Sequence, residues 1–568
     1  MKLLDSRRLT GPGLLLDRAG AVVEVSLEPG EAEPAVVAWR EQARRILEAV
    51  GWGEEEAVAR VFPGGASLAI SAPIDGLYSA TEVNEWAWTA AETVVRGIGD
   101  PPDPAEAAGR LRAEIERERN PALLALQDAA RERGVAFLWG EDLATVGLGK
   151  GSRTWPLDAL PAPGEVDWDA VHDIPVLLVT GTNGKTTTVR LLSAMFRAAG
   201  KTVGTTSTDR VEVGGETLDQ GDCSGPGGAR TLLRDPRVEV AVLETARGGI
   251  LRRGLAIDRA DAALVTNIAA DHLGEFGVHD LTSLAAAKLV VTRAVSMGGT
   301  VVLNADDPEL VRASRALVAP VSWFSLDPEN PVLRTQLGVG GPAAFLSGDE
   351  LVLVTVGERR TVARLDEIPA AFGGAARYNV ANALAAIALA ATLHLPLKDM
   401  AAGLRAFESG PEDNPGRANL FERDGVRVLV DYAHNPHGVE ALLPLAATLP
   451  AERRLLLIGQ AGDRDDEALR DFARATWPFQ PDFVVVKELP DMLRGRQPGE
   501  VPAILEDEFR RLGMAPQAIV RTDSEIEGVR RALSWARPGD VLLLLVHTQR
   551  EAVMEMLRGP ATSPQPLS

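Results

Sequence analysis

The chain has 568 residues, of which 59 are Lys or Arg and 80 are Asp or Glu, so its formal net charge is −21. A chain of this length exceeds the size of one hydrophobic core, and we expect several domains. The negative charge argues against a nucleic-acid backbone or an anionic membrane as the main partner. A single cysteine, Cys223, excludes an internal disulfide or a cysteine-rich zinc site, and we interpret it as incidental.

No stretch of the sequence looks like a targeting or membrane segment. The N-terminal MKLLDSRRLTGPGLLLDRAG lacks the apolar core of a secretory signal, and the most apolar run, VLLLLV at 541–546, is too short to cross a bilayer. Together with the lack of disulfides, these features predict a cytoplasmic protein that does not bind membranes.

Residues 1–148 predict a small α+β domain. The run SLAISA is typical of a strand, whereas TEVNEWAWTAAETVVRG and PALLALQDAARERG have apolar residues at the three- and four-residue spacing of helices. This region contains no chemical motif, so its role stays open. Residues 149–173 are rich in Gly, Pro and Trp and predict a linker.

Residues 174–415 and 416–558 predict two α/β domains in tandem. In the first, short apolar runs separated by helical patterns favour a mostly parallel sheet covered by helices on both faces; the runs are IPVLLVT, VEVAVLET, AALVTNI and GTVVLNA. A hairpin, LVLVTVGERRTVARL, and a helix, NVANALAAIALAATL, follow. In the second domain the runs VRVLVDYA, RRLLLIGQAG, FVVVKE and DVLLLLVHT indicate a Rossmann-like sheet. The last residues, 559–568, predict a disordered tail.

The segment VTGTNGKTTTVRLL, residues 179–192, predicts a phosphate-binding turn. A strand ends at Thr180, a glycine-rich turn follows, and a helix begins, so that backbone N–H groups and a helix N-terminus surround an anion. The usual P-loop would place glycine at Val179, so this is a shorter variant. We expect the nucleoside triphosphate to contact Gly181, Thr182, Asn183, Gly184, Lys185, Thr186 and Thr187.

Three further residues stand at positions that suit chemistry. Glu244 ends a buried strand, where its carboxylate would lie at the carboxyl edge of the sheet, and His272 follows the next such strand. Taken alone, His272 is better explained as a structural residue. Lys288 lies on an apolar stripe in the helical pattern DLTSLAAAKLVVTRAV, which extends to Val295; its ammonium would be buried, or would reach the surface by snorkelling.

These motifs, in this order, resemble those of the Mur ligase family of ATP-dependent amide ligases. The resemblance rests on GTNGKT, TNIAADHLGEFG, YNVANALAA, NPGR and DYAHNP. Within that family, two longer segments resemble the ligase half of cyanophycin synthetase, which attaches arginine to aspartate side chains of a polyaspartate chain. The segments are GDCSGPGGARTLLRDPRVEVAVLETARGGILRRGL and VVVKELPDMLRGRQPGE. That enzyme has an ATP-grasp domain before this half. Here no room remains for one, so we do not expect this chain alone to elongate a polymer.

The resemblance implies roles for individual residues. Lys185, Lys288, His272 and Glu244 would be catalytic, with Thr186, Glu244 and His272 as Mg²⁺ ligands and Lys288 carrying a CO₂-derived carbamate. Asn382 would contact adenine, Asp431 the ribose and Arg417 the phosphates of ATP. Arg494 in LPDMLRGR would bind the α-carboxylate of an incoming amino acid. Arg247, which precedes two glycines in ETARGGILRRG, could form an anion-binding turn for the acceptor carboxylate.

The preferred interpretation is an ADP-forming ligase that joins an amino acid, arginine as the first guess, to an acidic small-molecule or peptide acceptor. Two alternatives stay open: a P-loop phosphotransferase that stops at phosphate transfer, and a catalytically inactive ATP-binding scaffold. The sequence leaves undecided the donor, the acceptor and the oligomeric state, a homo-oligomer included.

Overall fold

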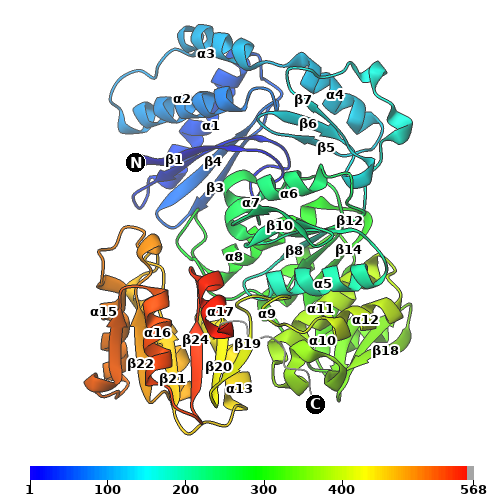
Figure 1. Ribbon diagram of the computed structural model, residues 1–568. Helices are drawn as coiled ribbons and strands as arrows, with labels where there is room; N and C mark the ends of the chain where they lie inside the picture. The colour runs from blue at the N-terminus through cyan, green and yellow to red at the C-terminus, as the bar shows by residue number, and fades with distance from the viewer. Residues whose placement is uncertain (560–568) are drawn as a thin grey trace.

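The computed structural model describes residues 1–559 and consists of three modules (Figure 1). The predicted disordered tail lies outside the described residues, except for Gly559. Across 1–559, no helix combines the length and the apolar character that a membrane span requires.

The N-terminal module is a four-stranded antiparallel sheet packed against helices, so the predicted α+β domain is confirmed. Its strands run in the order β1 (Lys2–Leu9), β2 (Gly20–Ser26), β4 (Gly65–Ser71) and β3 (Ala57–Phe62). Its helices are α1 (Ala32–Val50), α2 (Leu77–Arg96) and α3 (Pro104–Glu118). Inside the core, the indole N–H of Trp39 donates to Oδ1 of Asn84 at 2.9 Å and so joins α1 to α2.

Residues 149–173 do not form the linker that we predicted. They contribute a strand to a second small sheet, made of β5 (Phe137–Trp139), β6 (Leu143–Val146) and β7 (Arg153–Pro156). Val166 and Val171 are buried in an apolar cluster beside this sheet, with residues of helix α4 (Pro121–Glu132). The reason is the burial of Val and Trp side chains that lie among the glycines and prolines of this stretch.

The central module is built on an eleven-stranded sheet. Its order is β11 (Glu216–Gln220), β10 (Arg210–Val213), β9 (Val203–Thr206), β12 (Val240–Glu244), β8 (Val176–Thr180), β13 (Ala260–Val265), β14 (Val295–Asn304), β15 (Val321–Ser325), β16 (Ala343–Ser347), β17 (Glu350–Thr355) and β18 (Glu358–Arg364). The strands from β9 to β16 are parallel, and antiparallel strands extend both edges. The predicted, mostly parallel sheet is therefore confirmed.

Helices cover both faces of this sheet, which explains the continuous apolar runs in its strands. In β8, Leu177 and Val179 pack into the core on one face, and Val176 and Leu178 into the core on the other. The helices are α5 (Lys185–Ala198), α6 (Pro226–Leu233), α7 (Arg247–Arg253), α8 (Leu281–Lys288), α9 (Pro308–Ala313), α10 (Pro331–Gly338), α11 (Arg377–Thr392) and α12 (Leu397–Ala406).

The helix predicted to run through Val295 is shorter in the structure. Helix α8 ends at Lys288, a 3-10 helix covers Leu289–Ala294, and Val295 begins β14. Val290, Val291 and Lys288 are nevertheless buried. The apolar residues are thus buried by tertiary packing, although the backbone changes from an α-helix to a 3-10 helix and then to a strand and forms no single long helix.

The third module is a six-stranded, Rossmann-like sheet with helices on both faces, as predicted. The strand order is β19 (Asn419–Arg423), β20 (Val426–Asp431), β24 (Val541–Leu545), β21 (Arg454–Ile458), β22 (Phe483–Lys487) and β23 (Ile519–Thr522), with only β19 antiparallel among these described strands. The helices are α13 (Pro436–Ala447), α14 (Asp466–Thr476), α15 (Glu500–Arg511), α16 (Glu525–Trp535) and α17 (Arg550–Arg558).

A buried ion pair lies at the carboxyl edge of this sheet. Lys487 and Glu525, each with a fully buried side chain, pair with one another. The Glu525 carboxylate also accepts backbone N–H groups of His547 at 2.7 Å, Thr548 at 3.0 Å and Gln549 at 2.6 Å. The pair thereby fixes the segment that leads from β24 into α17.

Replacing Lys487 with Met should leave a buried carboxylate without its cation. We expect the free energy of unfolding of the third module to fall by about 3 kcal/mol or more, because removal of one partner leaves the other charge buried without compensation. Calorimetry of K487M beside K398M, a change at an exposed lysine of α12, measures this. Equal unfolding profiles for the two variants would contradict the expectation.

Candidate active site

The turn between β8 and α5 has a backbone shape that requires glycine at two positions. Gly181 has φ +142° and Gly184 has φ +85°. A Cβ at Gly181 would lie 1.9 Å from Oγ1 of Thr266, and one at Gly184 would lie 2.2 Å from Oδ1 of Asn382. The turn is therefore packed directly against Thr266, which follows β13, and against α11, so both conformation and space explain the glycines of the motif.

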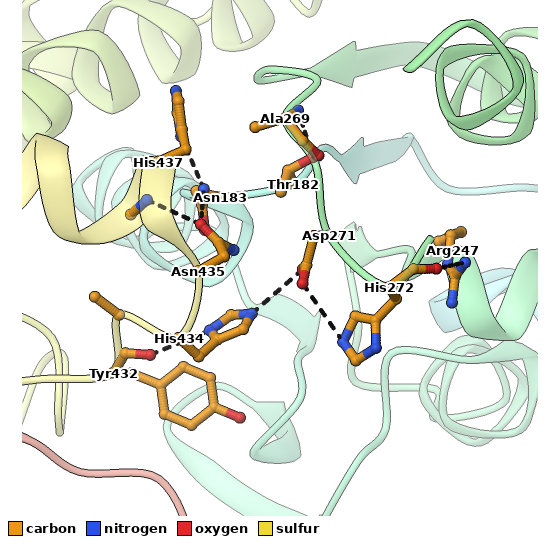
Figure 2. Close-up of polar contacts among 12 residues, drawn as sticks. Thr182, Asn183, Arg247, Ala269, Asp271, His272, Tyr432, His434, Asn435 and His437 are labelled. Carbon is orange, nitrogen blue, oxygen red and sulfur yellow. Dashed lines mark hydrogen bonds and ion pairs between the residues drawn. The ribbon is translucent and has the colours of Figure 1, made fainter. Parts of the chain in front are cut away.

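Asn183 at the tip of this turn is held by the central and third modules together. Its backbone N–H donates to Oδ1 of Asn267 at 2.9 Å. Its side-chain Nδ2 donates to Oδ1 of Asn435 at 3.1 Å, and its Oδ1 accepts from Nδ2 of Asn435 at 3.1 Å. The same Nδ2 lies 2.9 Å from Nδ1 of His437 (Figure 2). The phosphate-binding turn therefore doubles as a contact between modules.

Two lysine side chains converge on one carbonyl oxygen of the turn. Lys185 donates to the carbonyl oxygens of Gly181 at 3.0 Å and Thr182 at 2.9 Å, and Lys288 donates to that of Gly181 at 2.8 Å. Burial lowers the pKa of Lys288 well below its ordinary value, and the charge of Lys185 lowers it further. A neutral Lys288 amine satisfies this geometry without repulsion between two ammonium groups.

Glu244 is buried beside the turn with one oxygen atom free. Its Oε2 accepts the hydroxyl of Thr186 at 2.8 Å, whereas its Oε1 has no hydrogen-bond partner within residues 1–559. Burial raises the pKa of Glu244, and the positive charges of Lys185 and Arg417 oppose that rise. An orphaned carboxylate oxygen next to a threonine hydroxyl is a donor set that suits a hard divalent cation.

Arg417, from the turn between the central and third modules, reaches the phosphate-binding turn. Its guanidinium donates to Oγ1 of Thr186 at 3.1 Å and lies 3.4 Å from Asp209. Asp209 also pairs with Arg190 at 2.6 Å and with Arg550 at 2.8 Å. Despite its burial, Arg417, Arg550 and Arg190 keep the pKa of Asp209 below its usual range. Three guanidinium groups around one carboxylate give this end of the site an excess of positive charge.

A second cluster is centred on Asp271 and joins the central module to the third. Its carboxylate lies 3.4 Å from Nε2 of His434 and 3.8 Å from Nε2 of His272 (Figure 2). It also accepts a hydrogen bond of 2.7 Å from Nη2 of Arg464. Burial disfavours its charge, yet His434, His272 and Arg464 hold the pKa of Asp271 well below its usual range. The cluster is an electrostatic link between the two modules.

Of the three predicted Mg²⁺ ligands, Thr186 contacts Glu244, whereas the ring of His272 has other carboxylates as neighbours. Among the described residues, the groups of His, Asp and Glu atoms within 4.8 Å of one another place His272 with Asp271 and His434, or with Glu275 and Asp463, and not with Glu244. His272 has φ +49°, and its Nδ1 lies 3.4 Å from the carboxylate of Asp463. Thr186 and Glu244 do meet.

Arg247 and Arg494, the predicted carboxylate-binding residues, lie in the same cleft but already have partners. Arg247 is buried, donates to the backbone carbonyl of His272 at 2.6 Å and pairs with Glu275. Arg494 pairs with Asp463, which also contacts His272. Arg247 is therefore bonded to the backbone of His272, and Arg494 is linked to the His272 ring through Asp463.

Asn382 and Asp431 lie on opposite modules of the same cleft. Asn382 packs against Gly184 under the phosphate-binding turn. The carboxylate of Asp431 accepts the backbone N–H groups of Ala418 at 2.8 Å and Ala433 at 2.7 Å. Burial raises its pKa, and these donors oppose the rise.

One cleft of about 970 Å³ connects these groups. The predicted residues that line it are Thr182, Asn183, Gly184, Lys185, Thr186, Thr187, Glu244, Arg247, His272, Lys288, Asn382, Arg417, Asp431 and Arg494. Gly181 is the remaining predicted residue and contacts Lys185 and Lys288 through its carbonyl.

Several site residues were not predicted from the sequence. Asp271 and His434 stood inside quoted motifs, AADHLGEFG and DYAHNP, and the motifs could have pointed to them. Arg190, Asp209 and Arg550 had no such signal, because their cluster forms only when α5, the segment before β10 and the start of α17 meet.

The part of the chain that forms this cleft matches two known domains. Residues 179–390 match the Mur ligase middle domain, and residues 416–545 match the Mur ligase glutamate ligase domain. The chain belongs to the Mur ligase family. The resemblance inferred from its motifs is therefore confirmed, and GTNGKT, residues 181–186, lies at the start of the matched middle domain.

Relatives of this Mur ligase family member include cyanophycin synthetases. That of Trichormus variabilis is 37% identical over 390 residues, which are 68% of this chain and 43% of that protein, so the match spans less than half of the relative. The UDP-N-acetylmuramoyl-L-alanyl-D-glutamate–2,6-diaminopimelate ligase of Geobacter metallireducens is 28% identical over 445 residues, 73% of this chain and 82% of that protein. The crystal structure of MurF from Acinetobacter baumannii has a TM-score of 0.48 at 18% identity, covering 68% of this chain and 76% of that one.

The tight packing under the Mur ligase turn can be tested with two glycines that flank α5. Gly184→Ala adds a positive-φ penalty and a clash with Asn382, whereas Gly200→Ala, at φ +75° with no atom within 4 Å of its Cβ, adds the penalty alone. We expect G200A to cost about 1 kcal/mol and G184A clearly more. Thermal unfolding of both variants measures the difference; equal losses would show that the turn is not packed as described.

Proposed function

We propose that this protein is an ATP-dependent carboxylate–amine ligase that forms ADP and phosphate. The observation that supports it best is the single cleft in which a phosphate-binding turn, an orphaned buried carboxylate and arginines from two modules meet. Phosphate transfer to a carboxylate requires two anions to approach one another, and positive charge fixed in advance lowers that cost.

ATP is proposed to lie with its phosphates on the turn of residues 181–187. Backbone N–H groups at the start of α5 and the ammonium of Lys185 would hold the β- and γ-phosphates, and Arg417 would bind them from the third module. Asn382 is the proposed adenine contact and Asp431 the proposed ribose contact. Both Asp431 oxygens already accept backbone amides, so the ribose hydroxyls would add to these bonds through the remaining lone pairs.

A magnesium ion is proposed to bind at Glu244 and Thr186, where the free Oε1 and the hydroxyl offer oxygen ligands. When bound, it supplies charge neutralisation between the phosphates. His272 is the proposed further ligand. Its ring contacts Asp463 and would have to turn away from that carboxylate, and a rearrangement of the side chains around Asp271 would allow this. Lys185 and Arg417, which face Glu244, provide the fixed positive charge around the transferring group.

The proposed chemistry proceeds in two transfers. An acceptor carboxylate attacks the γ-phosphorus, the bond to the β-phosphate oxygen breaks, and ADP leaves. The amine of an amino acid then attacks the acyl carbon, loses a proton, and the tetrahedral intermediate expels phosphate, so an amide remains. Neither transfer needs a protein nucleophile, in keeping with Cys223, which is buried away from the cleft lining.

The proposed acceptor is an acidic amino acid or peptide, and the donor an amino acid with arginine as the first choice. An acceptor carboxylate would replace Glu275 as the partner of Arg247, because the Glu275 side chain is 40% exposed and can swing outward. The donor α-carboxylate would replace Asp463 on Arg494. The displaced Glu275 and Asp463 would then be free to bind a cationic donor side chain, which supports arginine.

The ligase is tested by the dependence of ADP release on both substrates. Twenty amino acids are screened against aspartate-rich and glutamate-rich peptides, with phosphate release and product mass as readouts. We expect a productive pair to give a product with the mass of the acceptor plus one amino acid minus one water, and hydroxylamine to trap the acyl phosphate as a hydroxamate. K185A should lower the rate at least 100-fold by removal of a transition-state charge, whereas K201A, an exposed lysine just beyond α5, should not.

Other outcomes of the screen would overturn the proposal. ADP release that needs an acceptor but no amine indicates a phosphotransferase. ATP binding without ADP release under any pair indicates a scaffold.

Lys288 is proposed to carry a carbamate formed from CO₂. The neutral amine is the reactive form for that addition, and burial favours it by lowering the pKa of Lys288; the carbamate oxygens would lie near the turn. Because the pKa of Lys288 is lowered, we expect the adduct to form at a lower pH than an ordinary lysine requires. With ¹³C-bicarbonate, NMR should detect a carbamate signal in the parent protein and none in K288R. A signal that persists in K288R would refute the assignment.

A further inference from the structure

The segment from His272 to His279, between β13 and α8, is an unusual loop that we call the His272 loop. Two of its non-glycine residues have a left-handed backbone, His272 with φ +49° and Phe276 with φ +50°. Inside it, the N–H of Gly274 donates to the carbonyl of Val278 at 2.7 Å. Left-handed conformations at bulky residues cost free energy and persist only where the surroundings hold them.

One side of the His272 loop lines the cleft, through His272 and Glu275. The His272 ring contacts Asp463, and its carbonyl accepts Arg247 at 2.6 Å. Glu275 pairs with Arg247 as well. If an acceptor carboxylate takes Arg247, the loop loses its Glu275 anchor, so another contact must keep His272 in position.

On its other side, the His272 loop is held by the N-terminal module. Arg60 of β3 donates through Nη1 to the carbonyl of Phe276 at 3.2 Å and through Nη2 to the carbonyl of Gly277. The guanidinium of Arg7 of β1 lies 4.7 Å from the centre of the Phe276 ring. Arg7 also donates to the carbonyl of Leu251 in α7, the helix that begins at Arg247.

The contact between β3 and the loop is closely packed. The Phe62 ring lies 5.6 Å from the His279 ring. A Cβ at Gly277, which has φ +67°, would lie 2.3 Å from Cδ1 of Phe62. Gly274, with φ +98°, has open space where its Cβ would be. Only one of the two glycines in this loop therefore faces the N-terminal module.

We propose that the N-terminal module serves the reaction by positioning the His272 loop, with Arg60 as the positioning residue. This inference rests on the proposed ligase function. The two carbonyl bonds from Arg60 fix the backbone at Phe276 and Gly277, which keeps His272 and Glu275 at the cleft while substrates exchange partners with Arg247. The first module thus acts as a fixed support on the side of the loop opposite the chemistry.

The direct test measures the loop and the kinetics in the same full-length variants. In R60A, we expect amide hydrogen exchange in the peptide that covers the His272 loop to accelerate at least tenfold, with the peptide of the phosphate-binding turn unchanged. We expect kcat to fall about tenfold while KM for ATP changes less than twofold, and R60K to recover part of the loss. R110A, at an exposed arginine of α3 that pairs with Glu82, is the control and should match the parent.

A second pair of variants approaches the loop from the central module and keeps the test decisive if R60A does not fold. G277A adds a clash with Phe62, whereas G274A adds only backbone strain. We expect G277A to reproduce the exchange and kinetic changes more strongly than G274A. Loop exchange that is unchanged in R60A, or equal in the two glycine variants, overturns the positioning role. Exchange does not depend on activity, so failure of the ligase proposal is seen separately, as absent ADP release by the parent protein.

Discussion

The buried carboxylate of Glu244 beside the phosphate-binding turn is the constraint around which this structure is organised. A carboxylate removed from water with one oxygen unsatisfied is costly unless cations lie close. Lys185 from α5 and Arg417 from the start of the third module provide these charges. Because the two cations come from different modules, the electrostatic environment of Glu244 is complete only when the modules are in contact.

The polar contacts between the central and third modules gather at the cleft, whereas Ala376 of the central module is buried in an apolar cluster of the third. Asn183 meets Asn435, Asp271 meets His434 and Arg464, and Arg550 meets Asp209. Interfaces made of such pairs can open and re-form at modest cost, since each charge can regain water. This is the property that a cleft needs if ATP enters between two modules and the reaction requires closure.

The sequence was sufficient for the fold of the second and third modules because their strands are buried on both faces and read as continuous apolar runs. It was also sufficient for the turn at 181–187, where glycine, lysine and threonine each have a physical reason at a fixed spacing. It failed at residues 149–173, where composition suggested a linker, because valine and tryptophan burial outweighs a high content of glycine and proline. It also missed Asp209, Arg190 and Arg550, because no local pattern records a cluster assembled from three distant segments.

The position of His272 illustrates why a motif does not determine geometry. The motif places a histidine after β13, but the left-handed backbone at that residue and the bonds of Arg247 and Asp463 decide where the ring lies. Those bonds in turn depend on a loop whose far side is fixed by Arg60 and Phe62, more than 200 residues earlier in the chain. A strained loop between a rigid sheet edge and a polar cleft can present its side chain in a defined place only if the rigid side is firmly attached. The first module, which has no chemical motif of its own, is therefore best understood through the backbone that it holds.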